Sequence, residues 1–247
     1  GATRTTGLTD ATVRGTLEHA AREISEIARL VDHAGDVRVM PEADETAVKT
    51  AGLGNYRVLH FAAHAAIDET APRRSAILLG RSQADDGLLQ LNEIAALDLR
   101  ARLVVAAACR SHLGRGIGGE GLMSLTRAFL QAGADGVVAA LWDVDDGETR
   151  TFMRLFYAGL RAGRAPDDAL RHAQSRMIAS GGRSAHPQNW AGFVLTGSAA
   201  APIFTEPAPP AVPGARWLWL IAAALLPAGA LAWRVRRARA PRAAIAG

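Results

Sequence analysis

His64 and Cys109, two residues whose side chains could act together in catalysis, each follow a short apolar run of sequence, over 56–63 and 103–108. A thiol and an imidazole within reach of each other form a nucleophile and a proton shuttle, because the imidazole favours the thiolate and can later protonate a leaving amine. Ligands bind at the carboxyl ends of parallel strands, so the two side chains open onto one crevice if the runs are neighbouring strands. From composition alone, a lone cysteine after an apolar strand is more often a buried, inert residue.

The same region also has the spacing of a metal site, since His60, His64, Cys109 and His112 include His-x-x-x-His and Cys-x-x-His pairs. On a helix, His60 and His64 would share one face and could bind one ion. In a strand they lie ~13 Å apart at ~3.3 Å per residue, too far for bonds of ~2 Å to a single metal. Cys109 is the only cysteine, which excludes an intrachain disulfide and a cysteine-rich metal cage. The sequence therefore predicts no metal and no cofactor.

These residues require a sheet to position them, and the chain alternates between apolar runs and helical patterns. Such uncharged runs fit parallel strands buried on both faces, and the alternation predicts a doubly wound, mostly parallel α/β sheet flanked by helices. The predicted strands cover 37–40, 56–63, 103–108, 136–141 and 193–195, and the predicted helices cover 13–31, 46–52, 120–132, 148–160 and 166–178.

Six stretches, in this order, resemble the CHAT domain, a relative of caspases and separases among the caspase-like cysteine peptidases. They are Tyr56 to His64, Asp86 to Leu89, Val104 to Ser111, Gly118 to Gly121, Leu141 to Asp146 and His186 to Phe193. The resemblance implies that His64 is the general acid and base, that Cys109 is the nucleophile, and that backbone N–H groups of Ala65 and Cys109 hold the oxyanion. It also implies that His60 is structural and that the glycine-rich loop over 114–121 forms a flexible wall of a peptide cleft rather than a phosphate cradle.

The function implied by the resemblance is that of a cysteine endopeptidase that cleaves a protein or peptide substrate and is activated by an upstream sensor or partner domain. One residue departs from the family, because Ala65 stands where the family usually has glycine. If that position needs a left-handed backbone, alanine costs ~1 kcal/mol or more. The alternative is a catalytically silent module of the same fold that binds a peptide and serves as a membrane-anchored scaffold.

Substrate choice is suggested by the acidic segment Trp142 to Asp146, which follows the predicted strand after Cys109. The segment resembles one in separases whose aspartate helps select a basic residue before the scissile bond, and this aspartate corresponds to Asp146, with Asp145 as the near alternative. Either residue could instead cap the helix expected to start near Gly147, because aspartate is a preferred N-cap. We therefore expect cleavage after Arg or Lys.

The charge of the chain is concentrated at its end. The formal net charge is +4, and five arginines lie in the last fourteen residues, so the rest carries 4 − 5 = −1. Nucleic-acid binding normally needs a cluster of basic residues on the folded domain, and the near-neutral charge of the rest of the chain does not favour one. No nucleic-acid partner is therefore expected.

The chain is expected to divide into an N-terminal amphipathic helix region (1–36), a CHAT-type domain (37–200), a Pro/Ala-rich linker (201–215), a transmembrane helix (216–234) and a basic tail (235–247). The apolar run has tryptophans near both ends, where bilayer interfaces favour them, and is followed by arginines. The sequence thus predicts a single-pass C-terminal membrane anchor, with the basic tail cytoplasmic and the catalytic domain outside the cytoplasm. A buried C-terminal helix of the domain is the alternative, which Pro227 and Gly229 favour.

Overall fold

The structure is a computed structural model, and it describes residues 22–31, 37–40, 43–68, 71–106, 110–112 and 120–204. The chain divides into two compact units, 1–204 and 205–247. Every described residue belongs to the first unit, so the predicted transmembrane helix and basic tail lie outside the described residues.

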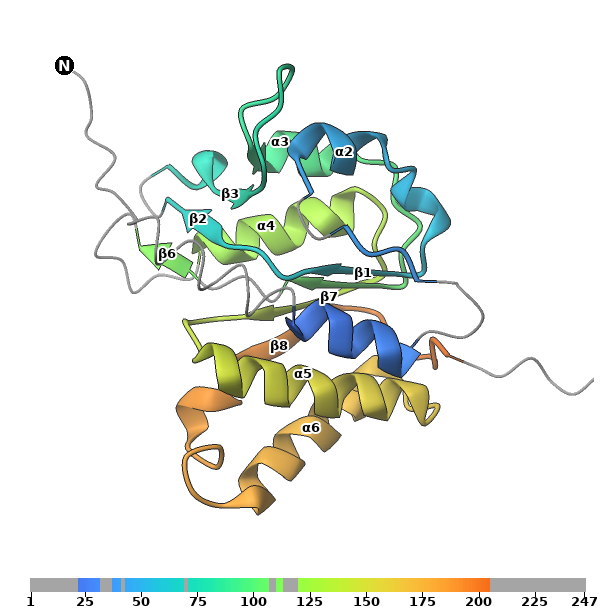
Figure 1. Cartoon of the computed structure of the whole chain (residues 1–247), viewed down its shortest axis with the longest axis vertical. Coiled ribbons are helices and arrows are strands. Elements are labelled where there is room, and N and C mark those ends of the chain that lie inside the picture. Colours follow the sequence, from blue (N-terminus) through green and yellow to red (C-terminus); the bar gives the residue numbers. More distant parts are fainter. Residues whose placement is uncertain are drawn as a thin grey trace, which may run out of the picture. The chain divides into compact units, whose positions relative to one another are not determined.

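A four-stranded main sheet forms the centre of this unit, in the order β1-β5-β7-β8 (Figure 1). The strands are β1 (Val58–Phe61), β5 (Leu103–Ala106), β7 (Gly136–Ala140) and β8 (Phe193–Gly197). β1, β5 and β7 are parallel, as their uncharged sequences predict, and β5 and β7 are buried at every position. The expectation that the 193–195 run is a parallel strand buried on both faces was wrong. β8 runs antiparallel to β7 at one edge of the sheet, where no described strand pairs with its outer side and most of its residues are only half buried.

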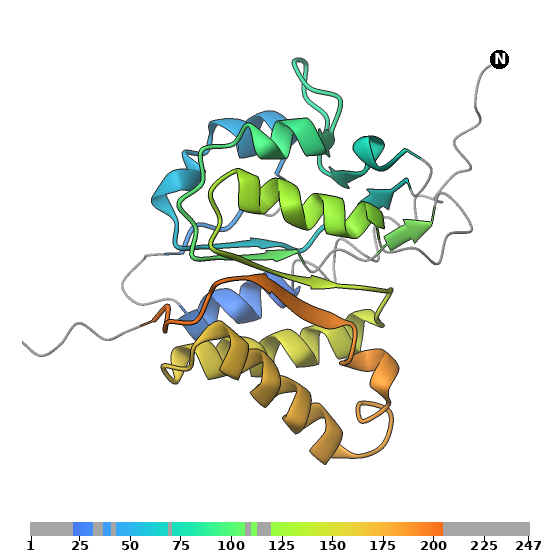
Figure 2. The same cartoon turned by 180° about the vertical axis from the view of Figure 1, so that it is seen from behind.

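Helices cover both faces of the main sheet (Figures 1 and 2). One face packs against α4 (Glu120–Gln131), with α2 (Glu45–Thr50) and α3 (Leu91–Ala95) beside it, and includes Phe61 and Phe129 with ring centroids 5.4 Å apart. The other packs against the helix over 22–31, α5 (Asp146–Arg161) and α6 (Pro166–Ser180), where Phe152 stacks on Phe193. Successive strand side chains point to opposite faces, so each apolar strand supplies both cores. The predicted α/β class, a mostly parallel sheet flanked by helices, is confirmed.

Helices α6 and α2 have the ends that their sequences favour. Pro166 occupies the first turn of α6, where its missing N–H is not needed, and Gly181 ends that helix with φ +70°. The Asp44 side chain caps α2 by accepting a hydrogen bond from the Ala47 N–H. The three-residue 3₁₀ helices are Leu53–Asn55, Pro72–Arg74 and Pro187–Asn189.

A second, smaller sheet extends beyond the carboxyl ends of β1 and β5, in the order β4-β3-β2-β6. Its strands are β2 (Ala65–Ile67), β3 (Ala76–Leu78), β4 (Leu88–Gln90) and β6 (Arg110–His112). The sequence pattern does not predict this sheet, because three-residue strands are too short to show a period. Three residues separate β2 from β1 in sequence, and three separate β6 from β5.

Two further differences concern the ends of the domain. Residues 37–40 form no strand, although their composition favours one, because no strand pairs with them among the described residues. The packed chain continues past residue 200, the expected end of the domain, to Phe204, since Ile203 is 2% exposed and the Arg161 guanidinium lies over the Phe204 ring. Within the described part of the chain, no helix combines the length and apolarity needed to cross a bilayer.

Candidate functional site

The candidate site lies at the carboxyl edge of the main sheet, where β1 and β5 end. Val58 of β1 pairs with Leu103 of β5, an offset of 45 positions, and this offset holds through Phe61 and Ala106. In the second sheet, Ala65 of β2 pairs with Arg110 of β6, again an offset of 45. The register of the parallel pair is therefore the same in both sheets, and His64 is the last residue before β2.

His64 is half buried, and its backbone is tied to the second sheet. The Leu78 N–H donates a hydrogen bond of 2.8 Å to the His64 carbonyl oxygen, which extends the pairing of β2 with β3 by one residue. Its predicted partner Cys109 and most of the glycine-rich loop over 114–121 lie outside the described residues.

Ala65 does not have the conformation that would make alanine costly. It is the first residue of β2, is 1% exposed, and pairs with Ile77 on one side and Arg110 on the other. A residue in such a strand has an extended backbone, in which alanine carries no left-handed strain. The condition under which Ala65 would weaken the site is therefore not met.

His60 uses both ring nitrogens inside the fold. Its Nδ1 lies 3.0 Å from the Tyr157 hydroxyl of α5, and its Nε2 lies 3.1 Å from a carboxylate oxygen of Glu23 in the helix over 22–31. Burial, with a smaller contribution from the Glu23 charge, raises the pKa of Tyr157 well above its ordinary value, so the hydroxyl keeps its proton and can donate to Nδ1. The imidazole of His60 is thus engaged in packing the N-terminal helix and α5 onto β1, which leaves no nitrogen for a metal.

The two candidate aspartates after β7 have different roles in the structure. Asp145 is the N-cap of α5, and its side chain accepts hydrogen bonds from the Gly147 and Glu148 N–H groups. Its other carboxylate oxygen accepts a bond of 2.8 Å from Arg183. Asp146 is the first residue of α5 and is half buried. The capping role therefore belongs to Asp145.

Two of the stretches that carried the resemblance pack against each other beside this helix start. The Trp142 indole N–H donates a bond of 2.8 Å to the Gln188 carbonyl, and the Leu141 N–H donates to the Gly192 carbonyl. A Cβ on Gly192 would come within 2.8 Å of the Trp142 ring, so only glycine allows this close packing. The segment over 186–193 thus holds the chain that leaves β7.

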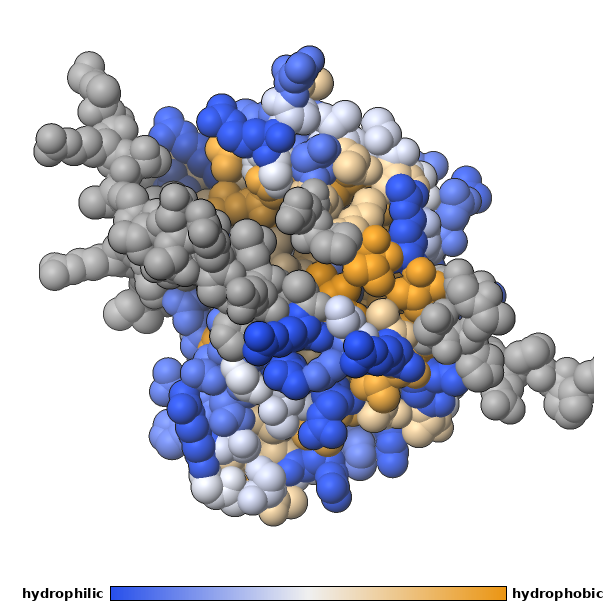
Figure 3. Space-filling view, in the orientation of Figure 1, coloured by the Kyte–Doolittle hydropathy of each residue, from blue (hydrophilic) through white to orange (hydrophobic). Residues whose placement is uncertain are grey.

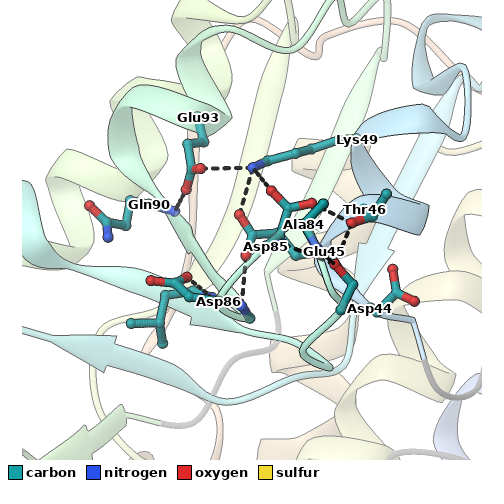
Figure 4. Close-up of polar contacts among 12 residues, drawn as sticks. Asp44, Glu45, Thr46, Lys49, Ala84, Asp85, Asp86, Gln90 and Glu93 are labelled. Carbon is teal, nitrogen blue, oxygen red and sulfur yellow. Dashed lines mark hydrogen bonds and ion pairs between the residues drawn. The ribbon is translucent and has the colours of Figure 1, made fainter.

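Another stretch that carried the resemblance, Asp86 to Leu89, belongs to an ionic cluster that the sequence pattern does not predict (Figure 4). The Lys49 ammonium of α2 contacts Glu45 at 2.6 Å, Asp85 at 2.8 Å and Glu93 at 2.7 Å. The buried Glu45 carboxylate also accepts a bond of 2.8 Å from the Gly87 N–H. Gly87 has φ +84°, and a Cβ there would lie 2.9 Å from the Leu79 carbonyl oxygen, so both its conformation and its packing require glycine. The available signal was that Lys49 is the only lysine in the chain.

The three carboxylates of this cluster could by themselves hold a cation, since their oxygens lie within 4.8 Å of one another. The Lys49 ammonium already occupies the position between them, and its hydrogen bonds to the three carboxylates raise its pKa far above the ordinary lysine value. The cluster is therefore a closed ion-pair network that joins α2, the β3–β4 hairpin and α3.

Comparison with known proteins adds two kinds of likeness. The chain is 39% identical over 111 residues to the mouse protein Tetratricopeptide repeat protein 28 and 36% identical over 111 residues to its human counterpart. In each case the match covers 45% of this chain and 4% of the relative, so the chain spans a small fraction of the length of these proteins. The family model of the CHAT domain matches residues 3–198, which is most of the chain and includes all the elements described above. The chain therefore belongs to the CHAT domain family, whose members are caspase-like.

Proposed function

We propose that this protein is a cysteine endopeptidase in which Cys109 is the nucleophile and His64 is the general acid and base. The observation that carries the proposal is that β1 pairs with β5 and β2 pairs with β6 in the same register. His64 precedes β2 directly and Cys109 precedes β6 directly, and the two residues are 45 positions apart, the same offset that pairs β1 with β5 and β2 with β6. Membership of a caspase-like family supports the same pair.

The proposed chemistry requires only these two side chains and backbone donors. His64 takes the thiol proton, the Cys109 sulfur attacks the scissile carbonyl carbon, and the resulting oxyanion is held by backbone N–H groups, for which Ala65 and Cys109 are the candidates. The His64 imidazolium then gives its proton to the leaving amine as the C–N bond breaks. Water, deprotonated by His64, hydrolyses the thioester and restores the thiol.

The protein partners of this activity are proposed from the relatives. The curated proteins that the chain matches are named as tetratricopeptide repeat proteins, and the matched part is 4% of their length. Such repeats stack into extended concave surfaces that bind other proteins. We therefore propose that the peptidase is controlled by a repeat-containing domain or partner.

The test compares two active-site variants with a matched control. Cys109→Ala and His64→Ala should each lower the cleavage rate of a peptide library at least a thousandfold, because each removes an essential group of the dyad. His172→Ala, which changes a histidine on α6, should keep activity within a factor of about two. Circular dichroism melting should show all three variants folded.

A second measurement separates the peptidase from the silent module. A peptide carrying an electrophile should modify Cys109 in the wild type and much more slowly in His64→Ala, because the imidazole supplies the thiolate. Peptide binding without cleavage and without a His64-dependent rate of modification would instead identify a catalytically silent binding module. Cleavage at the wild-type rate by Cys109→Ala would end the proposal.

A further inference from the structure

A cationic groove runs between the helix over 22–31 and the first half of α5, apart from the His64 site and the Lys49 cluster. It has a volume of about 530 Å³ and is lined by Glu26, Arg29, Leu30, Gly147, Arg150, Thr151 and Arg154. The positions on α5 recur at spacings of three and four, so they form one face of that helix. Figure 3 shows hydrophilic side chains gathered over these two helices.

The groove has an excess of positive charge because one carboxylate is surrounded by three arginines. Arg150 donates two hydrogen bonds to Glu26, one of them 2.8 Å long from its Nε. The bond from Arg150, followed by the charges of Arg150, Arg154 and Arg29, holds the pKa of Glu26 below its ordinary value. Glu26 therefore stays ionised and neutralises one of the three cations.

Arg29 and Arg154 are both exposed, and neither has an ion-pair partner among the described residues. Arg164 and Arg171 pair with Asp168 and Arg183 pairs with Asp145, whereas the exposed Arg127 and Arg176 also have no ion-pair partner among the described residues but lie outside the groove. The groove thus presents two guanidinium groups that no described carboxylate pairs with.

We infer that this groove is a docking surface for an acidic, carboxylate-rich segment of a protein partner. Each guanidinium offers a planar pair of donors that matches a carboxylate, so two uncompensated arginines call for two acidic side chains. The wall from Gly147 to Arg154 is about 10 Å long at 1.5 Å per residue, which fits about three residues of extended peptide. The partly buried Leu30 supplies an apolar contact.

Binding of a probe peptide tests this inference without any use of catalysis, so its outcome is separate from that of the proposed peptidase. The protein is the full chain with the five arginines from Arg234 to Arg242 changed to Gln, so that the basic tail does not compete, in nonionic detergent at low salt. The probe is a fluorescein-labelled hexaglutamate peptide with an amidated end, and hexaglutamine with the same dye is the control. Fluorescence anisotropy should show binding of hexaglutamate that is at least tenfold tighter.

Two double variants with equal loss of charge locate the binding. Arg29→Gln with Arg154→Gln should weaken hexaglutamate binding at least tenfold, whereas Arg127→Gln with Arg176→Gln, on α4 and α6, should change it less than twofold. Glu26→Gln should tighten binding at least threefold, because it frees Arg150 and removes the repelling carboxylate, an increase that a purely structural ion pair does not predict.

Three results would overturn the inference. The first is that hexaglutamate shows no measurable binding. The second is that the two double variants lose affinity equally. The third is that a phosphoserine peptide binds in the groove where hexaglutamate does not.

Discussion

At the scale of single residues, His60 and His64 show how neighbours in sequence separate in function. His60 is held by Tyr157 and Glu23 and helps to pack two helices onto β1. His64 lies past the end of that strand, at the edge where the parallel strands end, and its backbone continues into the second sheet. The difference arises from position relative to the strand end, because a side chain within a covered strand must find partners inside the fold.

Asp145 and Asp146 give a prediction at the same scale. We propose that Asp146, which the resemblance matches to the selective aspartate of separases, pairs with a basic residue before the scissile bond, and that Asp145 serves as the cap of α5 and the partner of Arg183. Asp146→Ala should lower cleavage after Arg or Lys at least tenfold relative to other residues. Asp145→Ala should keep the preference but lose about 1 kcal/mol of stability, because it removes the N-cap.

A peptide-library profile and thermal unfolding of both variants check this pair of expectations. An unaltered profile in Asp146→Ala, or a preference for acidic or apolar residues in the wild type, would rule out the assignment.

At the scale of elements, the Lys49 ammonium joins three pieces of chain. It contacts carboxylates from α2, from the β3–β4 hairpin and from α3. A chain that uses arginine at 27 of its 28 basic positions has lysine here. A compact ammonium with three donors can serve three carboxylates arranged around a point, whereas the planar guanidinium fork cannot.

The stability of this cluster should depend on pH. The hydrogen bond from Lys49 is the main cause of the lowered pKa of Asp85. At Glu93 burial raises the pKa, but bonds from Lys49 and the Gln90 N–H outweigh it, so the pKa is lowered. A carboxyl group whose pKa is lower in the folded state stabilises the fold above its unfolded pKa of ~4, and this contribution is lost as the pH falls through the folded-state value.

Lys49→Met should therefore lower the free energy of unfolding by about 2 kcal/mol at pH 7, because it leaves the buried Glu45 carboxylate without its cation. It should also flatten the loss of stability between about pH 5 and the acid limit. Urea unfolding across this range measures both effects, with the exposed Arg127→Met as the control. Equal stability of the two variants at pH 7 would show that the cluster contributes little.

At the scale of the whole molecule, we propose that the 216–234 segment anchors the protein in a membrane, with the 235–247 tail on the cytoplasmic side. In sealed vesicles whose cytoplasmic face points outward, protease should remove the tail and leave the catalytic domain protected, because basic flanks stay in the cytoplasm. Digestion of the domain together with the tail would refute the orientation. Release of the intact chain from the vesicles at alkaline pH would refute the anchor.

The sequence by itself determined the class of the fold, the main-sheet strands and the long helices, because a long periodic or uniformly apolar segment indicates which of its faces are buried. It also identified the CHAT family through short stretches, of which Gly87 and Gly192 are now explained by positive φ and by close packing. Only the tertiary structure decided the antiparallel edge strand β8, the second sheet, the Lys49 cluster, and the choice of Asp145 over Asp146 as the cap. The cap depends on the residue at which α5 begins, which two adjacent aspartates leave undecided. The other three depend on contacts between residues far apart in the chain, such as Gly87 with Glu45, and a local sequence pattern does not reveal such pairs.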